Sequence, residues 1–338
     1  MDGSQGEGGG QILRSSLALS MATGKPFRIH NIRAGRKKPG LMRQHLTCVR
    51  AAARICSAQV EGAELGSPAL YFRPGPMIPG QYSFSVGSAG SSTLVFQTLM
   101  PALITTGRPF ELTLEGGTHN PAAPTLDFLE HVYLAALKCM GVAATIQVER
   151  RGFFPNGGGK WNVAVTPSGA LVPLRLSERG RMLGQKAKVL WNRIPPQEAL
   201  RARAHLSATL GWDPADIEIE EAIDSPGPGN VIMAELRYEH ITEVLTAFNP
   251  FGASPEAVCD GLMVDVRRYQ EHGAPVGRRL ADQLLLPMAL GAGGIFRTMP
   301  LSSHSRTNIE TIGRFLDREI EVREVDSRVV QITVPPFT

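Results

Sequence analysis

The stretch SQGEGGGQILR at residues 4–14 and the stretch RGFFPNGGGK at residues 151–160 each hold three consecutive glycines in similar surroundings. A third glycine-rich turn, GAGG, occupies residues 291–294. Roughly 140 residues separate one stretch from the next, and self-similarity at a fixed period indicates repeated structural units. We therefore expect a repeated α/β unit along most of the chain.

Helices and strands are expected to alternate along the sequence. Apolar residues at helical spacing predict helices, and alternating or β-branched runs between them predict strands. The fold class is therefore mixed α/β. Glycines suited to left-handed caps follow four of the helices, at Gly24, Gly107, Gly141 and Gly211. The expected helices span residues 11–23, 43–56, 91–106, 125–140, 195–210, 254–271, 280–291 and 305–317, and the strands include 26–32, 82–86, 110–116, 144–150, 161–166 and 329–334.

The chain has 338 residues, which suggests two or three domains at roughly 100–200 residues per domain. Residues 178–274 differ from the rest, because they hold the acidic run DPADIEIEEAID at 213–224, a Pro/Gly loop at 225–230 and no glycine triplet. We expect this segment to form a small α/β domain. It would be inserted into a large catalytic domain formed by residues 1–177 and 275–338.

The composition is that of a folded protein, with 43% hydrophobic and 20% charged residues. The four cysteines form no C-x-x-C pair, which disfavours zinc and redox motifs and indicates reduced thiols. No apolar run reaches the roughly 20 residues that cross a bilayer. The start, MDGSQGEGGG, lacks the basic and apolar regions of a signal peptide. We therefore expect a cytoplasmic protein with no membrane partner.

Positive charge is concentrated near the start of the chain. Between Glu7 and Glu61 there are ten arginines and lysines and no acidic residue. Five of these cations crowd the stretch IRAGRKKPGLMRQH at residues 32–45. Arginine presents a planar fork that fits phosphate oxygens in pairs, so the stretch predicts a clamp on nucleic-acid phosphates. The alternative is an ordinary solvated basic face.

The glycines at residues 6–10 lead directly into an expected helix. Glycine lets the backbone approach a ligand, and a helix N-terminus favours phosphate. The pattern is neither a Walker P-loop nor a dinucleotide-binding fingerprint. Glu7 suits a phosphate site only if a cation bridges it, and carboxylate oxygens are ligands for magnesium. A plain glycine-rich turn is the alternative.

His304 is one of eight histidines and lies in the segment SSHSRTN at residues 302–308. Thr307 and Glu310 form a capping-box pattern, so His304 is expected just outside a positive helix end and beside Arg306. That setting favours a neutral, nucleophilic imidazole. Asp282 and Gln283 are expected to open an apolar helix, LADQLLLPMAL, where they could bind a base or a ribose.

Taken together, the motifs resemble those of the RNA 3′-terminal phosphate cyclase family. The resemblance implies a large domain of three repeated α/β units with a small inserted domain. It also implies a reaction in which a histidine takes AMP from ATP and passes it to the 3′-phosphate of RNA. The adjacent 2′-hydroxyl then expels AMP and leaves a 2′,3′-cyclic phosphate. The matching segments, in order, are DGSQGEGGGQILR, IRAGRKKPGL with RQHL, GSAGSSTLV with Gln97, GGTHNPAAP, GFFPNGGG, ADQLLLPMAL and SSHSRTNI.

The resemblance also assigns roles to individual positions, with ATP and a divalent cation (Mg or Mn) as the implied small molecules. Where family members often have an aromatic residue before the ADQ turn, this chain has Arg279, whose guanidinium plane could also stack on a base. The implied nucleophile is His304, the nucleotide site is Glu7, Arg14, Gln97, Pro124, Phe128, Arg279, Leu280, Ala281, Asp282 and Gln283, the RNA or phosphate site is Arg33, Arg36, Arg43 and Gln44, and the metal ligand is Glu7.

Three other functions compete with this interpretation. A non-catalytic RNA-binding assembly factor of the same fold would lack the nucleophile that His304 provides. An enolpyruvyl-type transferase uses similar repeats but needs neither ATP nor a histidine nucleophile. A single-stranded RNA-binding module would need a stacking surface, and aromatic residues make up only 6% of the chain.

Overall fold

A computed structural model describes residues 1–167, 169–249 and 253–337. Within these residues, three sheets share one strand order. When the strands of each unit are numbered along the chain, the first and second are neighbours and run parallel. The fourth strand lies between the second and the third and runs antiparallel to both. In the first unit, an isolated parallel bridge from Asp2 to His30 takes the place of the first strand. In spatial order the strands are β1 (Phe27–Ile29), β3 (Leu70–Arg73) and β2 (Gln59–Glu61) in the first unit, β4 (Gly80–Ser85), β5 (Phe110–Gly116), β7 (Gly159–Pro167) and β6 (Val142–Arg150) in the second, and β8 (Leu174–Leu176), β13 (Gly294–Thr298), β15 (Val330–Val334) and β14 (Glu321–Glu324) in the third.

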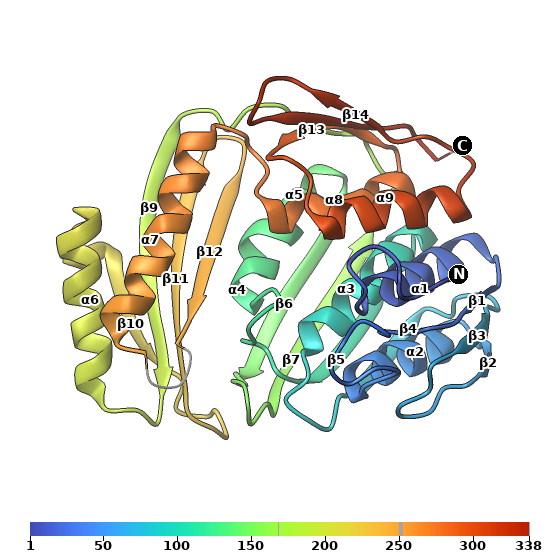
Figure 1. Cartoon of the computed structure of the whole chain (residues 1–338), viewed down its shortest axis with the longest axis horizontal. Helices are drawn as coiled ribbons and strands as arrows, with labels where there is room; N and C mark the ends of the chain where they lie inside the picture. Colours follow the sequence, from blue (N-terminus) through green and yellow to red (C-terminus); the bar gives the residue numbers. More distant parts are fainter. Residues whose placement is uncertain (168, 250–252, 338) are drawn as a thin grey trace.

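Each unit also contributes helices, which pack against one another between the sheets (Figure 1). Helix α1 contacts helices of all three units and is buried along most of its length, which explains why its sequence carries almost no charge. The helices are α1 (Gln11–Thr23) and α2 (Arg43–Ile55), then α3 (Ser92–Leu103) with the short η1 (Ile104–Thr106) and the continuous run α4 (Leu126–Phe128), η2 (Leu129–Tyr133) and α5 (Leu134–Cys139), and finally α8 (Arg278–Ala289) and α9 (Ser303–Phe315).

The glycine stretches do not mark the repeat, although the repeat exists. The first precedes α1, the second joins β6 to β7, and the third joins α8 to β13. These are three different positions within the unit. The mixed α/β class and the repeated units are confirmed, but the spacing that suggested them was coincidental.

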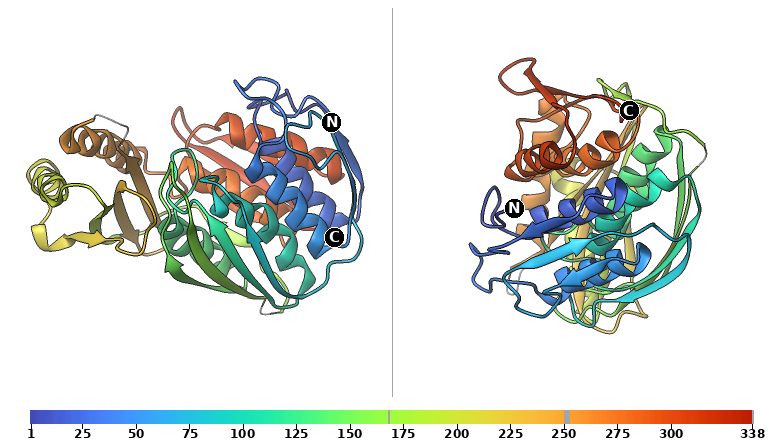
Figure 2. Two further views of the ribbon diagram at one scale, coloured as in Figure 1. Left: turned by 90° about the horizontal axis from the view of Figure 1, so that it is seen from below. Right: turned by 90° about the vertical axis from the view of Figure 1, so that its right-hand side faces the viewer.

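The segment from β9 to α7 interrupts the third unit between β8 and α8. Its sheet has the order β10-β9-β11-β12, and α6 and α7 cover one face of that sheet, so a lobe with its own hydrophobic cluster stands beside the large body (Figure 2). We propose this inserted lobe as a separate domain, and the boundaries at 178 and 274 stay a prediction. Its elements are β9 (Met182–Asn192), α6 (Pro196–Leu210), η3 (Pro214–Asp216), β10 (Ile217–Glu221), β11 (Gly229–Tyr238), β12 (Thr242–Phe248) and α7 (Pro255–His272).

None of the helices in the described parts of the chain is both long enough and apolar enough to cross a membrane.

Candidate active site

A buried asparagine joins three helices at the centre of the large body. The Oδ1 of Asn308 on α9 accepts hydrogen bonds from Nε2 of Gln11 (2.9 Å) and Oγ of Ser15 (2.5 Å), both on α1. Its Nδ2 donates to the backbone oxygen of Asp282 on α8 (2.8 Å). These bonds use both polar ends of a side chain that is only 1% exposed, so they fix the first turns of α9 relative to α1 and α8.

The capping box expected at Thr307 and Glu310 is wrong. Helix α9 begins earlier, because the hydroxyl of Ser302 accepts the backbone N–H of Ser305 (3.0 Å) and supplies the cap. His304 therefore lies inside the first turn of α9 and not outside the helix. Thr307 is buried, and its hydroxyl instead accepts the backbone N–H of Glu7 (3.1 Å).

His304 is exposed, and its surroundings favour the neutral imidazole. Partial desolvation lowers the pKa of His304 below its ordinary value. Glu7 opposes that shift, whereas the positive charges of Arg14 and Arg36 reinforce it. At neutral pH the ring nitrogens can therefore act as a nucleophile.

Glu7 closes over the glycine loop in front of α1. Its Oε1 accepts the backbone N–H of Gln11 (2.9 Å), and its Oε2 pairs with Nη2 of Arg36 (2.5 Å). Burial raises the pKa of Glu7, but these contacts and the charge of His304 outweigh it and lower the pKa overall. The loop needs glycine, because Gly6 has φ of 62° and a Cβ there would lie 2.2 Å from the Thr307 hydroxyl.

A pocket lies between α1, α3 and α8, and several of the expected nucleotide-site residues line it: Arg14, Gln97, Asp282 and Gln283. Among the described residues, Oδ1 of Asp282 and Oε1 of Gln283 are buried and have no hydrogen-bond partner. Burial raises the pKa of Asp282 to about 7. Unpartnered buried polar atoms are costly, so they point to a polar ligand in this pocket.

The helix that carries these residues starts earlier than the sequence suggested. Helix α8 begins at Arg278, so Asp282 and Gln283 lie in its second turn and do not open it. Leu280 and Ala281 are buried in the hydrophobic core at 0% and 2% exposure, and they are not among the residues that line the pocket.

Arg14 is the cation of this pocket. Its Nη2 donates to Oε1 of Gln11 (2.7 Å), and it forms no ion pair with the described carboxylates. Burial lowers the pKa of Arg14, although Glu7 and Asp282 raise it in part. A desolvated guanidinium with unused donors is a strong site for phosphate oxygens.

Three more expected nucleotide-site residues are Arg279, Phe128 and Pro124, which do not line this pocket. The guanidinium carbon of Arg279 lies 5.9 Å from the ring centroid of Phe128, which is 1% exposed. The backbone oxygen of Pro124 accepts the hydroxyl of Thr93 (2.8 Å). Arg279 is itself exposed, whereas the Phe128 ring beside it is buried.

The arginines of the basic loop before α2 differ in their contacts. Arg33 donates to the backbone oxygens of Lys38 (2.6 Å) and Gly40 (3.0 Å), so it holds the loop together. Arg36 pairs with Glu7, and Arg43 is exposed at the start of α2.

Gln44 connects the basic loop to the next unit. Its Oε1 accepts the backbone N–H of Ser91, the cap of α3 (2.8 Å). Gln44 therefore fixes the loop before α3 in this structure.

His45 is a site residue that sequence reasoning did not assign. It is 8% exposed, its Nδ1 has no hydrogen-bond partner among the described residues, and a Cβ on Gly10 would lie 2.2 Å from its Nε2. Burial, reinforced by Arg14 and Arg33, lowers the pKa of His45 to about 3, so the imidazole is neutral. The only signal in the sequence was its place in the RQHL motif.

The family model for RNA 3′-terminal phosphate cyclase matches residues 5–322 of this chain. The chain belongs to the RNA 3′-terminal phosphate cyclase family. Three relatives carry the name RNA 3′-terminal phosphate cyclase. The protein from Pseudomonas fluorescens is 46% identical over 96% of this chain and 95% of its own length. The cyclases of Koribacter versatilis and Ralstonia nicotianae are each 47% identical, over 97% and 99% of this chain and over 92% and 96% of their own lengths.

A solved structure of the EPSP synthase from Acinetobacter baumannii aligns with 95% of this chain and 62% of its own, at 10% identity and a TM-score of 0.25. That likeness is too weak to bear on the fold or the function of this cyclase-family member.

The described residues contain no group of three or more histidine, cysteine, aspartate or glutamate side chains that could hold a metal ion. Glu7 is a single carboxylate, so a cation there would need most of its ligands from a substrate.

Proposed function

We propose that this chain uses ATP to convert an RNA 3′-phosphate end to a 2′,3′-cyclic phosphate, through a histidine–AMP adduct and an RNA adenylate. The observation that carries the proposal is His304, an exposed imidazole in the first turn of α9, whose pKa is lowered by partial burial and by the charges of Arg14 and Arg36 against the opposing charge of Glu7. Pyrophosphate leaves in the first step and AMP in the last. The four free cysteines fit a reducing compartment, so we propose the cytoplasm as the location.

In the first step, a ring nitrogen of His304 attacks the α-phosphorus of ATP. A P–N bond forms as the P–O bond to pyrophosphate breaks. The Arg14 guanidinium and the N-terminus of α9 offset the charge on the phosphoryl oxygens, which is the main catalytic need in such a transfer. Asp282 and Gln283 take the polar atoms of adenosine, because their buried oxygens have no partner among the described residues.

In the second step, an oxygen of the RNA 3′-phosphate takes AMP from His304. Arg43 is exposed, and Arg36 is half-exposed, so both can reach this phosphate. The 2′-hydroxyl of the same nucleotide then attacks the activated phosphate and expels AMP. That attack is intramolecular, so it needs little help from a base, and the hydroxyl proton passes to water.

A divalent cation would be held by Glu7 together with phosphate oxygens of ATP. Magnesium commonly binds one or two carboxylates plus substrate phosphates, which fits a single acidic ligand here. The cation would supply positive charge to the departing pyrophosphate.

Two RNA substrates test the proposal. Both end in a 3′-phosphate, and one of them has a 2′-deoxy terminal nucleotide. With ATP and magnesium, the ribo-terminated RNA should gain a 2′,3′-cyclic phosphate, whereas the deoxy-terminated RNA should accumulate as the adenylate. The deoxy end keeps the phosphate but lacks the attacking hydroxyl. Cyclisation without ATP, or no adenylate from the deoxy end, would contradict the proposed order of steps.

Arg43→Ala should separate the RNA step from the ATP step. Arg43 forms no ion pair with described residues, so its loss should slow transfer of AMP to RNA by about 10- to 100-fold and leave self-adenylation within about twofold. Arg36→Ala should impair both steps, because Arg36 also pairs with Glu7. Single-turnover rates for each step measure the difference, and an equal loss of both steps in Arg43→Ala would place Arg43 on ATP.

A further inference from the structure

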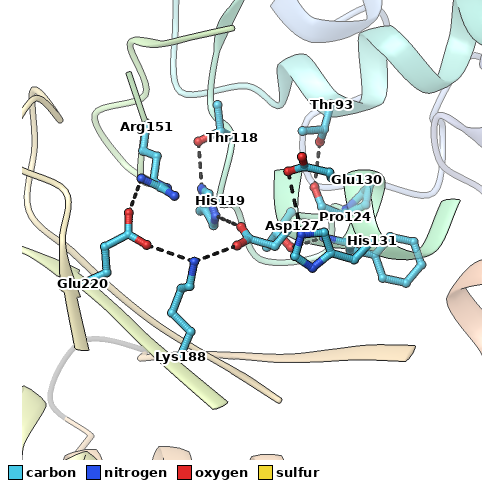
Figure 3. Close-up of polar contacts among 12 residues, drawn as sticks. Thr93, Thr118, His119, Pro124, Asp127, Glu130, His131, Arg151, Lys188 and Glu220 are labelled. Atoms are coloured by element: carbon cyan, nitrogen blue, oxygen red, sulfur yellow. Dashed lines mark hydrogen bonds and ion pairs between the residues drawn. The ribbon is translucent and has the colours of Figure 1, made fainter. Parts of the chain in front are cut away.

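A series of ion pairs crosses the junction between the large body and the inserted lobe (Figure 3). Arg151, beyond β6, pairs with Glu220 on β10. Glu220 pairs with Nζ of Lys188 on β9 (2.9 Å), and the same Nζ lies 3.6 Å from Oδ1 of Asp127 on α4. The series of ion pairs thus starts and ends on the large body, and its two middle members belong to the inserted lobe.

Asp127 is the residue through which this series of ion pairs reaches the proposed nucleotide site. Its Oδ2 bonds to Nε2 of the buried His119 (2.9 Å), and its side chain is only 13% exposed. Burial raises the pKa of Asp127, but His119 and Lys188 outweigh it and lower the pKa overall. In the sequence, Asp127 lies between Pro124 and Phe128, so an aspartate held from the inserted lobe also fixes the segment expected to contact adenosine.

The inserted lobe also reaches the start of α8. Glu243 on β12 is 2% exposed, and among the described residues its Oε2 has no hydrogen-bond partner. That oxygen would lie 2.1 Å from a Cβ on Gly277, the N-cap of α8. Burial raises the pKa of Glu243 to about 7, although the charge of Arg279 lowers it in part, and α8 carries both Arg279 and Asp282.

We propose that the inserted lobe is a positioning element of the nucleotide site, in which Lys188 holds Asp127 and thereby sets the Pro124–Phe128 segment for selection of the adenine base. Lys188 touches no substrate in this account and acts through Asp127. The inference rests on the proposed function, because it needs Pro124 and Phe128 to contact adenosine.

Lys188→Met tests the proposal, because it keeps the length of the side chain and removes the charge. The measurement is self-adenylation of the full chain with ATP and with GTP. We expect the KM for ATP to rise about fivefold, the maximal rate to stay within about twofold, and the preference for ATP over GTP to fall. Lys188→Arg should restore most of the preference, since it keeps the cation among the carboxylates of Asp127, Glu218 and Glu220.

Lys186→Met is the matched control. Lys186 lies two residues earlier on the same strand, and its Nζ pairs at 3.4 Å with Glu235, which in turn pairs with His131 of the large body and does not reach Asp127. This variant should keep the KM and the selectivity of the unmodified chain. If Lys188→Met does not fold, Asp127→Asn replaces it and should show the same rise in KM.

The possible outcomes separate the two proposals. An unmodified chain that takes no label at His304 overturns the proposed function, and the inference with it. An unmodified chain that labels normally while Lys188→Met keeps its KM and its ATP preference overturns the inference alone. A fall in maximal rate that is equal for ATP and GTP, with no change in KM, also overturns it, because that pattern belongs to a general loss of structure.

Discussion

The His304→Ala variant should take up no label from ATP that carries a radioactive α-phosphate. Removal of a covalent nucleophile leaves no group to accept AMP, so we expect labelling to fall by at least about 10³-fold. The fold should be unaffected, because the imidazole is exposed and makes no hydrogen bond or ion pair with the described residues. The melting temperature should therefore change by less than about 2 °C.

His240→Ala is the control for this prediction. His240 is also exposed, but it lies on the inserted lobe, and its replacement should leave labelling intact. Labelling that persists in His304→Ala would assign the nucleophile to another residue.

Arg14→Leu should lose activity without losing stability. The substitution keeps much of the apolar contact and removes a desolvated cation that pairs with no described carboxylate. The lost contact to phosphate is worth about 3–4 kcal/mol, which corresponds to a decrease of about 10²- to 10³-fold in the rate of self-adenylation. The free energy of unfolding should stay the same or rise by about 1 kcal/mol, because a partly buried cation without an ion pair is costly.

Rates of labelling and urea unfolding curves for Arg14→Leu test the two halves of this prediction. Arg201→Leu serves as a control, since Arg201 pairs with Glu256 on the inserted lobe (2.8 Å), and its loss should leave labelling unchanged. A large loss of stability in Arg14→Leu, with labelling near normal, would mean that Arg14 is structural.

Local sequence patterns were enough to predict the helices. Amphipathic spacing and glycine caps predicted α1, α2 and α6 to within a residue or two of their ends. The strands of the inserted lobe were harder. β9 and β11 are long central strands whose residues do not alternate cleanly, because tertiary packing decides which faces are buried.

The candidate site was predictable where a residue type matched a motif, and not where tertiary contacts decide its role. His304 was named from its motif, but its cap was not, because Ser302 and Thr307 are both plausible caps and only packing against Glu7 distinguishes them. Asn308 and Lys188 had no local signal, since their partners lie far away in the sequence.

The most direct test of the central claim is to locate the AMP on the chain. After incubation with ATP and magnesium, tryptic digestion at alkaline pH and mass spectrometry should find one AMP on the peptide TMPLSSHSR, residues 298–306, in which His304 is the only histidine. The adduct should be lost in acid, as a P–N bond is, and discharged by RNA with a 3′-phosphate but not by RNA with a 3′-hydroxyl. AMP on a different peptide, or an adduct that RNA 3′-phosphate does not discharge, would contradict the account.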